Sequence, residues 1–265
     1  MSWLQDRIKN MQRYPADFDG VIEDVRVELF AELARLLVGL ETSQGALSPT
    51  VSNLERVDQI LLQLGDTLFE PEAKYLLGLE SYLGGLVGSA QLANAALKVP
   101  ASPQYQAVLD TLILSTQQLF DRTAVNALLT QNLRNAITQN VVSGARTVDA
   151  IDVLRGLVLG DEQRLGFLTR YAKTWTLTGF ATAERQYVTT VAEQQGVKLW
   201  RYSGGTVADS RDFCIAREGR TFTTEEVKAW ADLDWQGKAY GTDSETIFAY
   251  LGGYNCMHAL EPVLD

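Results

Sequence analysis

The stretch that decides the fold class runs from Val21 to Leu40 and reads VIEDVRVELFAELARLLVGL. Its apolar residues return every three or four positions, at Val21, Val25, Leu29, Leu33, Leu36, Leu37 and Leu40. This spacing places the side chains on one face of an α-helix, so the stretch predicts an amphipathic helix over residues 21–41. Acidic side chains favour helix N-termini, and Asp17 and Asp19 lie just upstream. We therefore expect the helix to begin directly after them.

The same spacing recurs along the chain to about residue 195. Ser52-Asn-Leu-Glu55 fits a capping box, in which two side chains satisfy backbone N–H groups at a helix start. It predicts a helix from there to Leu64. Further helices are expected over 72–97, 108–141, 147–158 and 161–191, separated at Pro100–Pro103, Ser143–Gly144 and Gly160–Asp161 and closed by Gly196.

One glycine-rich run, Gly84-Gly-Leu-Val-Gly88, loosely resembles a phosphate-binding loop. Such a loop follows a β-strand, and the sequence predicts no strand before this one. We therefore interpret the glycines as points where a helix packs closely against its neighbours.

The pattern changes after Gly196. Val197–Tyr202 alternates and is rich in β-formers, which predicts a strand, and Arg220–Phe222 predicts a second. Thr223-Thr-Glu-Glu226 is another capping box, opening a short helix, and Cys256–Val263 is expected to be a last strand. The expected fold class is α+β, mainly α, with a helical body followed by a small mixed module. We divide the chain into residues 1–100, 101–196 and 197–265.

Composition and net charge exclude several classes of function. The chain has 265 residues, is 46% hydrophobic and carries a net charge of −10, so it can build a core and its surface does not favour sequence-independent binding of nucleic acid. A local DNA contact stays open. Two cysteines do not make a disulfide framework, and neither a secretory signal nor a membrane span is visible. We expect a soluble protein made in a reducing compartment.

Both cysteines and the single histidine, Cys214, Cys256 and His258, fall in the last module. Residues i and i+2 of a strand point to one face, so Cys256 and His258 would share a region that Cys214 could reach. Thiolate and imidazole are preferred zinc ligands, and structural sites usually hold four. Asp209, Asp212 or water could supply the fourth.

Two other interpretations stay open for the same residues. Cys214 and Cys256 could be free buried thiols beside a hydrogen-bonded histidine, or they could form one disulfide. A structural zinc is therefore a hypothesis, and no other cofactor is expected. The sequence shows no phosphate-binding loop and no nucleophile elbow, so nothing in it argues for an enzyme.

The module also carries a family resemblance. The runs concerned are Leu199-Trp-Arg-Tyr-Ser-Gly-Gly-Thr206, Asp209-Ser-Arg-Asp-Phe-Cys214, Gly219-Arg-Thr-Phe-Thr-Thr-Glu-Glu226 and Gly252-Gly-Tyr-Asn-Cys-Met-His258. They resemble the C-terminal module of tailed-phage minor head proteins, the Mu F-like or phage head morphogenesis family. The similarity covers about residues 110–263 and is most specific at Asp209–Cys214 and Gly252–His258. Met257 departs from the arginine usual in that family, so no anion contact is assigned there.

The resemblance implies a structural virion component rather than an enzyme. Family members are minor capsid proteins present in several copies, associated with the portal or the major capsid protein, and active in head assembly and genome packaging or ejection. It implies a location in the phage head after assembly in the host cytoplasm. A head-completion connector or an ejected internal protein is the alternative. A third reading is a small zinc-dependent hydrolase or toxin, with Glu218 or Asp212 as its base.

Overall fold

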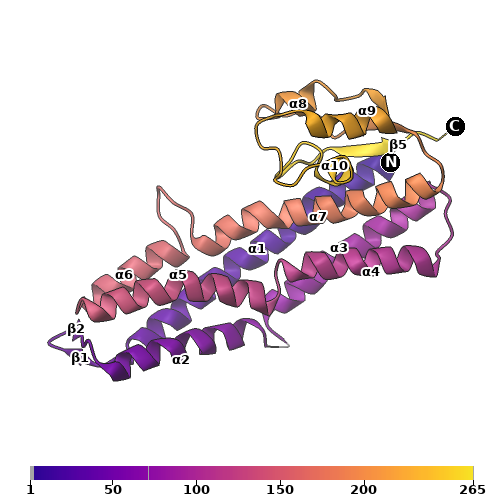
Figure 1. Ribbon diagram of the computed structural model, residues 1–265. Helices are drawn as coiled ribbons and strands as arrows, with labels where there is room; N and C mark the ends of the chain where they lie inside the picture. Colours follow the sequence, from indigo (N-terminus) through magenta and orange to yellow (C-terminus); the bar gives the residue numbers. More distant parts are fainter. Residues whose placement is uncertain (1–2, 71, 265) are drawn as a thin grey trace. The chain divides into compact units, whose positions relative to one another are not determined.

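A computed structural model describes residues 3–70 and 72–264. The helices are α1 (Trp3–Leu37), α2 (Val51–Leu68), α3 (Lys74–Ala96), α4 (Pro103–Gln118), α5 (Arg122–Val142), α6 (Thr147–Val158), α7 (Phe167–Gln194), α8 (Asp212–Ile215), α9 (Thr224–Ala229) and α10 (Ile247–Tyr250), with a 3-10 turn η1 (Trp230–Asp232). The strands are β1 (Thr42–Ser43), β2 (Ala46–Leu47), β3 (Leu199–Ser203), β4 (Thr221–Thr223) and β5 (Ala259–Pro262). The predicted fold class, α+β and mainly α, is confirmed (Figure 1).

The chain divides into two compact units, each made of separate segments. Unit 1 holds the described residues of 1–16, 81–117 and 174–265, and unit 2 those of 17–80 and 118–173. The division falls inside α1, α3 and α7, so these helices contribute to both units, and it also separates the last residue of α4 from the rest of that helix. The division predicted along the chain, at residues 100 and 196, stays a prediction.

Unit 2 is a helical assembly with a small hairpin. Helix α2 packs against α5, and α5 packs against α6. Aromatic rings fill its core: Phe18 contacts Tyr75 and Phe120, and Phe120 contacts Tyr171. The Tyr75 hydroxyl donates to the Phe120 carbonyl at 2.7 Å, which satisfies its polar end inside the core.

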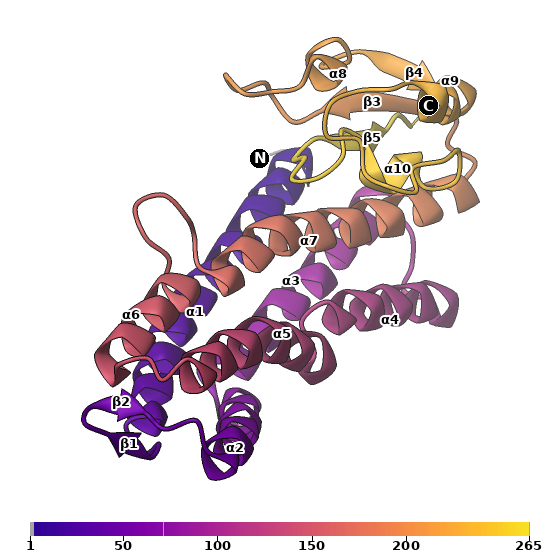
Figure 2. The same ribbon diagram turned by 60° about the vertical axis from the view of Figure 1, so that its left-hand side comes forward.

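Unit 1 contains the three-stranded antiparallel sheet, in the order β4-β3-β5. Trp200 and Tyr202 alternate with exposed neighbours along β3 and are fully buried, as the two-residue period of a strand requires. Tyr202 contacts Phe213 and Trp230, which fixes α8 and the turn η1 against the sheet. Figures 1 and 2 both show β5 lying between α7 and the pair α8 and α9.

Several predicted helix boundaries are wrong. Helix α1 begins at Trp3, far before residue 21, and contains Pro15. Its buried face continues back through Phe18 and Met11 to Arg7, and the charge of Arg7 hides the apolar period from the sequence pattern. Helix α2 is capped by the Thr50 side chain and not by Ser52.

Two further predicted helix boundaries are also wrong. The helix expected over 108–141 is two helices, α4 and α5, because Asp121 caps α5 by accepting from the Ala124 N–H. Asp161 does not begin a helix: its carboxylate accepts from the N–H groups of Gln163 and Arg164 and closes a turn before α7.

The strands of the last module agree better with the sequence. Strands β3 and β4 and the capping box of Thr223 with Glu226 are confirmed. Gly196 follows α7 with φ +78, the conformation that a helix C-terminal glycine supplies. Strand β5 begins only at Ala259, so Cys256 and His258 lie before it and not within it.

Candidate metal centre

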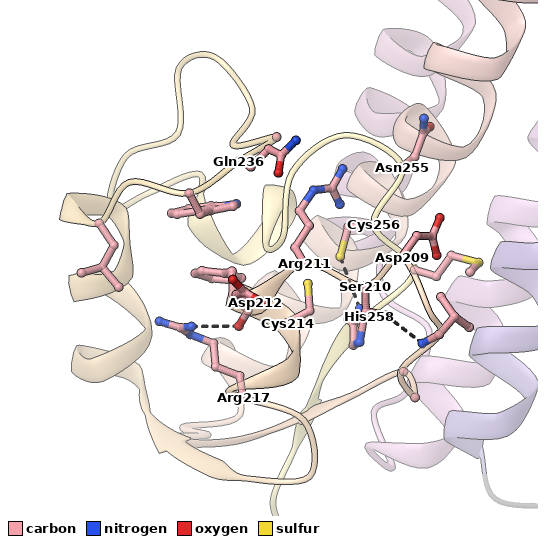
Figure 3. A pocket seen from close by; sticks show the side chains of 18 of the residues that line it. Asp209, Ser210, Arg211, Asp212, Cys214, Arg217, Gln236, Asn255, Cys256 and His258 are labelled. Carbon is pink, nitrogen blue, oxygen red and sulfur yellow. Dashed lines mark hydrogen bonds between the residues drawn. The ribbon is translucent and has the colours of Figure 1, made fainter.

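The structure brings the three candidate ligands together. Cys214 lies in α8, while Cys256 and His258 lie in the segment that leads into β5. Their donor atoms all lie within 4.8 Å of one another, and all three residues are buried. The Cys256 Sγ is 3.7 Å from the Nδ1 of His258. Figure 3 shows the three side chains turned toward one another, with Arg211 beside Cys256.

Two glycines make this approach possible. A Cβ on Gly252 would lie 2.5 Å from the Cys214 Sγ and 2.9 Å from the Cys256 Sγ. A Cβ on Gly204 would lie 2.7 Å from the Cα of His258. A side chain at either position would displace the metal-ligand candidates, so only glycine fits at both.

The turn before β5, and not the pleat of a strand, aims the two ligands. Asn255 has φ +56, a left-handed conformation that asparagine tolerates better than most residues. Arg211 donates to the Tyr254 carbonyl at 2.7 Å and so ties the start of α8 to this turn. The sequence therefore identified the right residues, but its reason, the shared face of a strand, was wrong.

The surroundings of the two thiols are unequal. The hydrogen-bonding Cys214 thiol, the Arg185 guanidinium and His258 hold the pKa of Cys256 well below its ordinary value. The hydrogen bond with Cys256 and burial raise the pKa of Cys214. Arg185 is itself buried and donates to the Ala249 carbonyl at 3.0 Å and to the Cys256 carbonyl. One thiolate is thus already favoured beside a buried cation.

Tyr202 closes the other side of the cluster. Its hydroxyl donates to the Cys214 Sγ at 3.3 Å, and its ring lies 5.1 Å from that of His258. Burial raises the pKa of Tyr202 well above its ordinary value, so the hydroxyl stays a donor.

This donor set suits a zinc ion. Two sulfurs and one imidazole nitrogen are among the ligands that zinc prefers. In a tetrahedral site the zinc-to-ligand lengths place a sulfur and a nitrogen roughly 3.6 Å apart, close to the 3.7 Å between Cys256 Sγ and His258 Nδ1. The three donors, all within 4.8 Å of one another, can therefore hold a metal once the wider separations close toward tetrahedral spacing.

The fourth ligand expected from Asp209 or Asp212 is not part of the cluster. Among the described residues, the group that could hold a metal contains only Cys214, Cys256 and His258. Asp209 and Asp212 are both exposed. A metal here would take water or another small molecule as its fourth ligand.

The cluster lies in the wall of a cleft of about 1000 Å³. Trp235 and Leu233 contribute apolar surface, while Arg211, Asp209 and Asp234 contribute charge of both signs. A fourth metal position facing this cleft would be open to exchange with solvent.

The sequence missed most of the supporting residues. Arg185 lies on α7, outside the module, and Gly204 and Gly252 looked like ordinary turn residues. No local pattern distinguishes them, because their roles come from contacts made across the fold.

Among the described residues, no helix is both long and apolar enough to cross a membrane. Comparison with known proteins found no matching family model and no significant match among curated proteins or solved structures. The resemblance to phage minor head proteins therefore rests on the motifs of the chain alone.

Proposed function

We propose that this chain is a minor head protein of a tailed bacteriophage, with a structural role in head assembly. The observation that supports this most directly is the placement of the two most specific motif segments. Asp209–Cys214 and the last four residues of Gly252–His258 lie about 40 residues apart in the sequence and line the same cleft. Parts of both segments that carry the resemblance thus meet at one place, which supports a shared module.

The proposal includes a structural zinc on Cys214, Cys256 and His258. The strands of the sheet are only three to five residues long, and a metal would add a crosslink to the aromatic core that Trp200, Tyr202 and Phe213 provide. A metal would join α8 to the segment before β5, which are otherwise connected by hydrogen bonds such as Arg211 to Tyr254. Structural zinc contributes directly to folding free energy, so it would fasten the module.

The partners proposed are the portal protein, the major capsid protein, or both. The net charge of −10 favours docking on protein surfaces over a broad grip on DNA. Several copies per particle, assembled in the host cytoplasm, would form part of the phage head. A head-completion connector or an ejected internal protein is the alternative role within the same particle.

The test is quantitative mass spectrometry of purified particles, normalised to the major capsid protein. A small fixed number of copies per particle supports the minor head role. Absence from particles overturns it. Metal analysis of the purified chain, with Cys256→Ser as the control, tests the zinc separately: one zinc per chain is expected, and none in the variant.

A second candidate function, a zinc-dependent hydrolase, is favoured by the cleft. Three protein ligands with an open fourth position are the arrangement of catalytic zinc. Removal of the metal would then abolish hydrolysis while the module stays folded. For a structural zinc, removal would instead loosen the module, and circular dichroism with hydrogen exchange distinguishes the two.

A further inference from the structure

The two ring nitrogens of His258 face different groups. Nδ1 is directed at the metal cluster, 3.7 Å from the Cys256 Sγ. Nε2 lies on the other edge of the ring, 3.4 Å from the Oε2 of Glu218. The His258 side chain is only 8% exposed and that of Glu218 is 29% exposed, so the contact is largely shielded from water.

These two facing atoms are both without a hydrogen-bond partner. The His258 Nε2 and the Glu218 Oε2 are buried, and neither meets hydrogen-bond geometry with any described group. A buried polar atom left unpaired costs free energy. A shift of about half an ångström would join them at an ordinary hydrogen-bond length and would satisfy both at once.

The rest of Glu218 is held in place. Its Oε1 accepts from the Gly205 N–H at 3.1 Å. Its own N–H donates to the Cys214 carbonyl at 3.0 Å, so it sits one helical turn after that ligand. The carboxylate is therefore attached to the same turn that carries Cys214.

We infer that Glu218 is a positioning residue of the metal centre. It accepts the Nε2–H of His258, which fixes the ring orientation and leaves Nδ1 as the bare donor for the metal. Ligating histidines generally donate their second N–H to a carboxylate or carbonyl in this way. The inference rests on the metal site proposed above and names a role for Glu218 other than the general base of a hydrolase.

The charges of the site agree with this role. A divalent ion balances two thiolates, which leaves the Glu218 carboxylate as an uncompensated negative charge. Arg185, the buried cation beside Cys256, supplies the matching positive charge. These charges balance one another, and Arg211 adds a further positive charge beside the thiols.

The first test uses the histidine itself. His258 is the only histidine in the chain, so labelling the imidazole with ¹⁵N gives the NMR spectrum of one ring. In the zinc-loaded full chain we expect a protonated Nε2 and a metal-bound Nδ1. A metal-bound Nε2 would overturn the inference while leaving the metal site in place.

The second test measures affinity. Zinc is removed from the full chain and returned in competition with a chromophoric chelator, and Co²⁺ is used to read the thiolate charge-transfer and d–d bands. We expect Glu218→Ala to weaken zinc binding about 10- to 100-fold and to shift the d–d bands, with a smaller loss in Glu218→Gln. Asp234→Asn, an exposed carboxylate in the same cleft that no interpretation places at the metal, is the matched control and should leave the affinity unchanged.

The outcomes separate the two proposals. Wild-type affinity in Glu218→Ala overturns the role of Glu218 and leaves the zinc proposal standing. A wild-type chain that binds neither Zn²⁺ nor Co²⁺ overturns both. Unfolding of the metal-free variants is followed alongside, and if Glu218→Ala does not fold, the tautomer measured in the wild-type chain decides.

Discussion

Arg7 and Glu184 form a two-point ion pair across 177 positions of the chain. The Arg7 Nε donates to the Glu184 Oε1 at 2.5 Å and its Nη2 to the Oε2 at 2.8 Å. The two side chains are 0% and 1% exposed. Arg7 also donates to the Leu260 carbonyl at 3.2 Å, so one guanidinium links α1, α7 and β5 within unit 1.

Glu184→Ala should destabilise unit 1 by about 3–5 kcal/mol, because it leaves the Arg7 cation buried without its partner. Urea denaturation measures the loss. Glu193→Ala, an exposed acid on the same helix, should change stability by less than about 0.5 kcal/mol. Equal effects from the two variants would show that the ion pair does not contribute as described.

Neighbouring glycines of α3 should respond in opposite directions to the same substitution. A Cβ on Gly84 would meet nothing within 4 Å, whereas a Cβ on Gly85 would overlap the ring of Tyr14. Gly84→Ala should therefore stabilise the chain by about 0.5–1 kcal/mol. Gly85→Ala should destabilise it by about 1–3 kcal/mol, as thermal unfolding can measure.

Gly252→Ala should weaken zinc binding about tenfold or more, the size of effect that disturbed second-shell groups have. The added methyl would push apart the sulfurs of Cys214 and Cys256. The chelator competition described above measures it, with Gly84→Ala as the control that keeps full affinity. Unchanged affinity in Gly252→Ala would mean that the metal does not lie between these sulfurs.

The thiol pair should give the metal-free chain a two-sided pH dependence of stability. The pKa of Cys256 lies below its ordinary value of about 8.5, so its contribution is complete above that pH and is lost as pH falls through the lowered value. The pKa of Cys214 is raised, so its contribution is complete below about 8.5 and is lost as pH rises toward the raised value.

Unfolding measured against pH should separate the two groups. Because each thiol shifts the pKa of the other, Cys256→Ser should abolish the loss on the acid side and reduce the alkaline one, while Cys214→Ser should abolish the alkaline loss and reduce the acid one. Thiolate absorbance should show one titration step below the ordinary value of a cysteine, with the other thiol of the pair still protonated after it. A single step near the ordinary value would contradict the unequal surroundings.

Cys256→Ser should also show how independent the two units are. We expect amides of β3 and β5 to lose hydrogen-exchange protection, while those of α2 and α5 keep it, because the latter lie in unit 2. Protection lost from all four elements together would show that the chain unfolds as one body.

Features of the fold that depend on residues close in sequence were predicted correctly. The alternation around Trp200 and the capping box of Thr223 depend on near neighbours, and both were predicted correctly. The three candidate ligands were found because cysteine and histidine are rare in this chain. Rarity and local spacing can be read without knowing the fold.

Contacts between distant residues could not be predicted. No local pattern marks Arg7 as buried, because its partner lies 177 positions away. The orientation of His258 depends on Glu218, which a sequence can only propose as one of several nearby acids. The long-range contacts that place these residues also determine where α1 begins.

The link from Arg7 to Glu184 also sets an order of events during synthesis. At a translation rate of about 5–20 residues per second, roughly 9 to 35 s pass between the synthesis of Arg7 and that of Glu184. Unit 2 is composed entirely of residues before Thr174, so its sequence is complete before Glu184 has been made. During that interval the Arg7 guanidinium has no carboxylate partner on α7, and its buried ion pair can form only once synthesis has reached the last third of the chain.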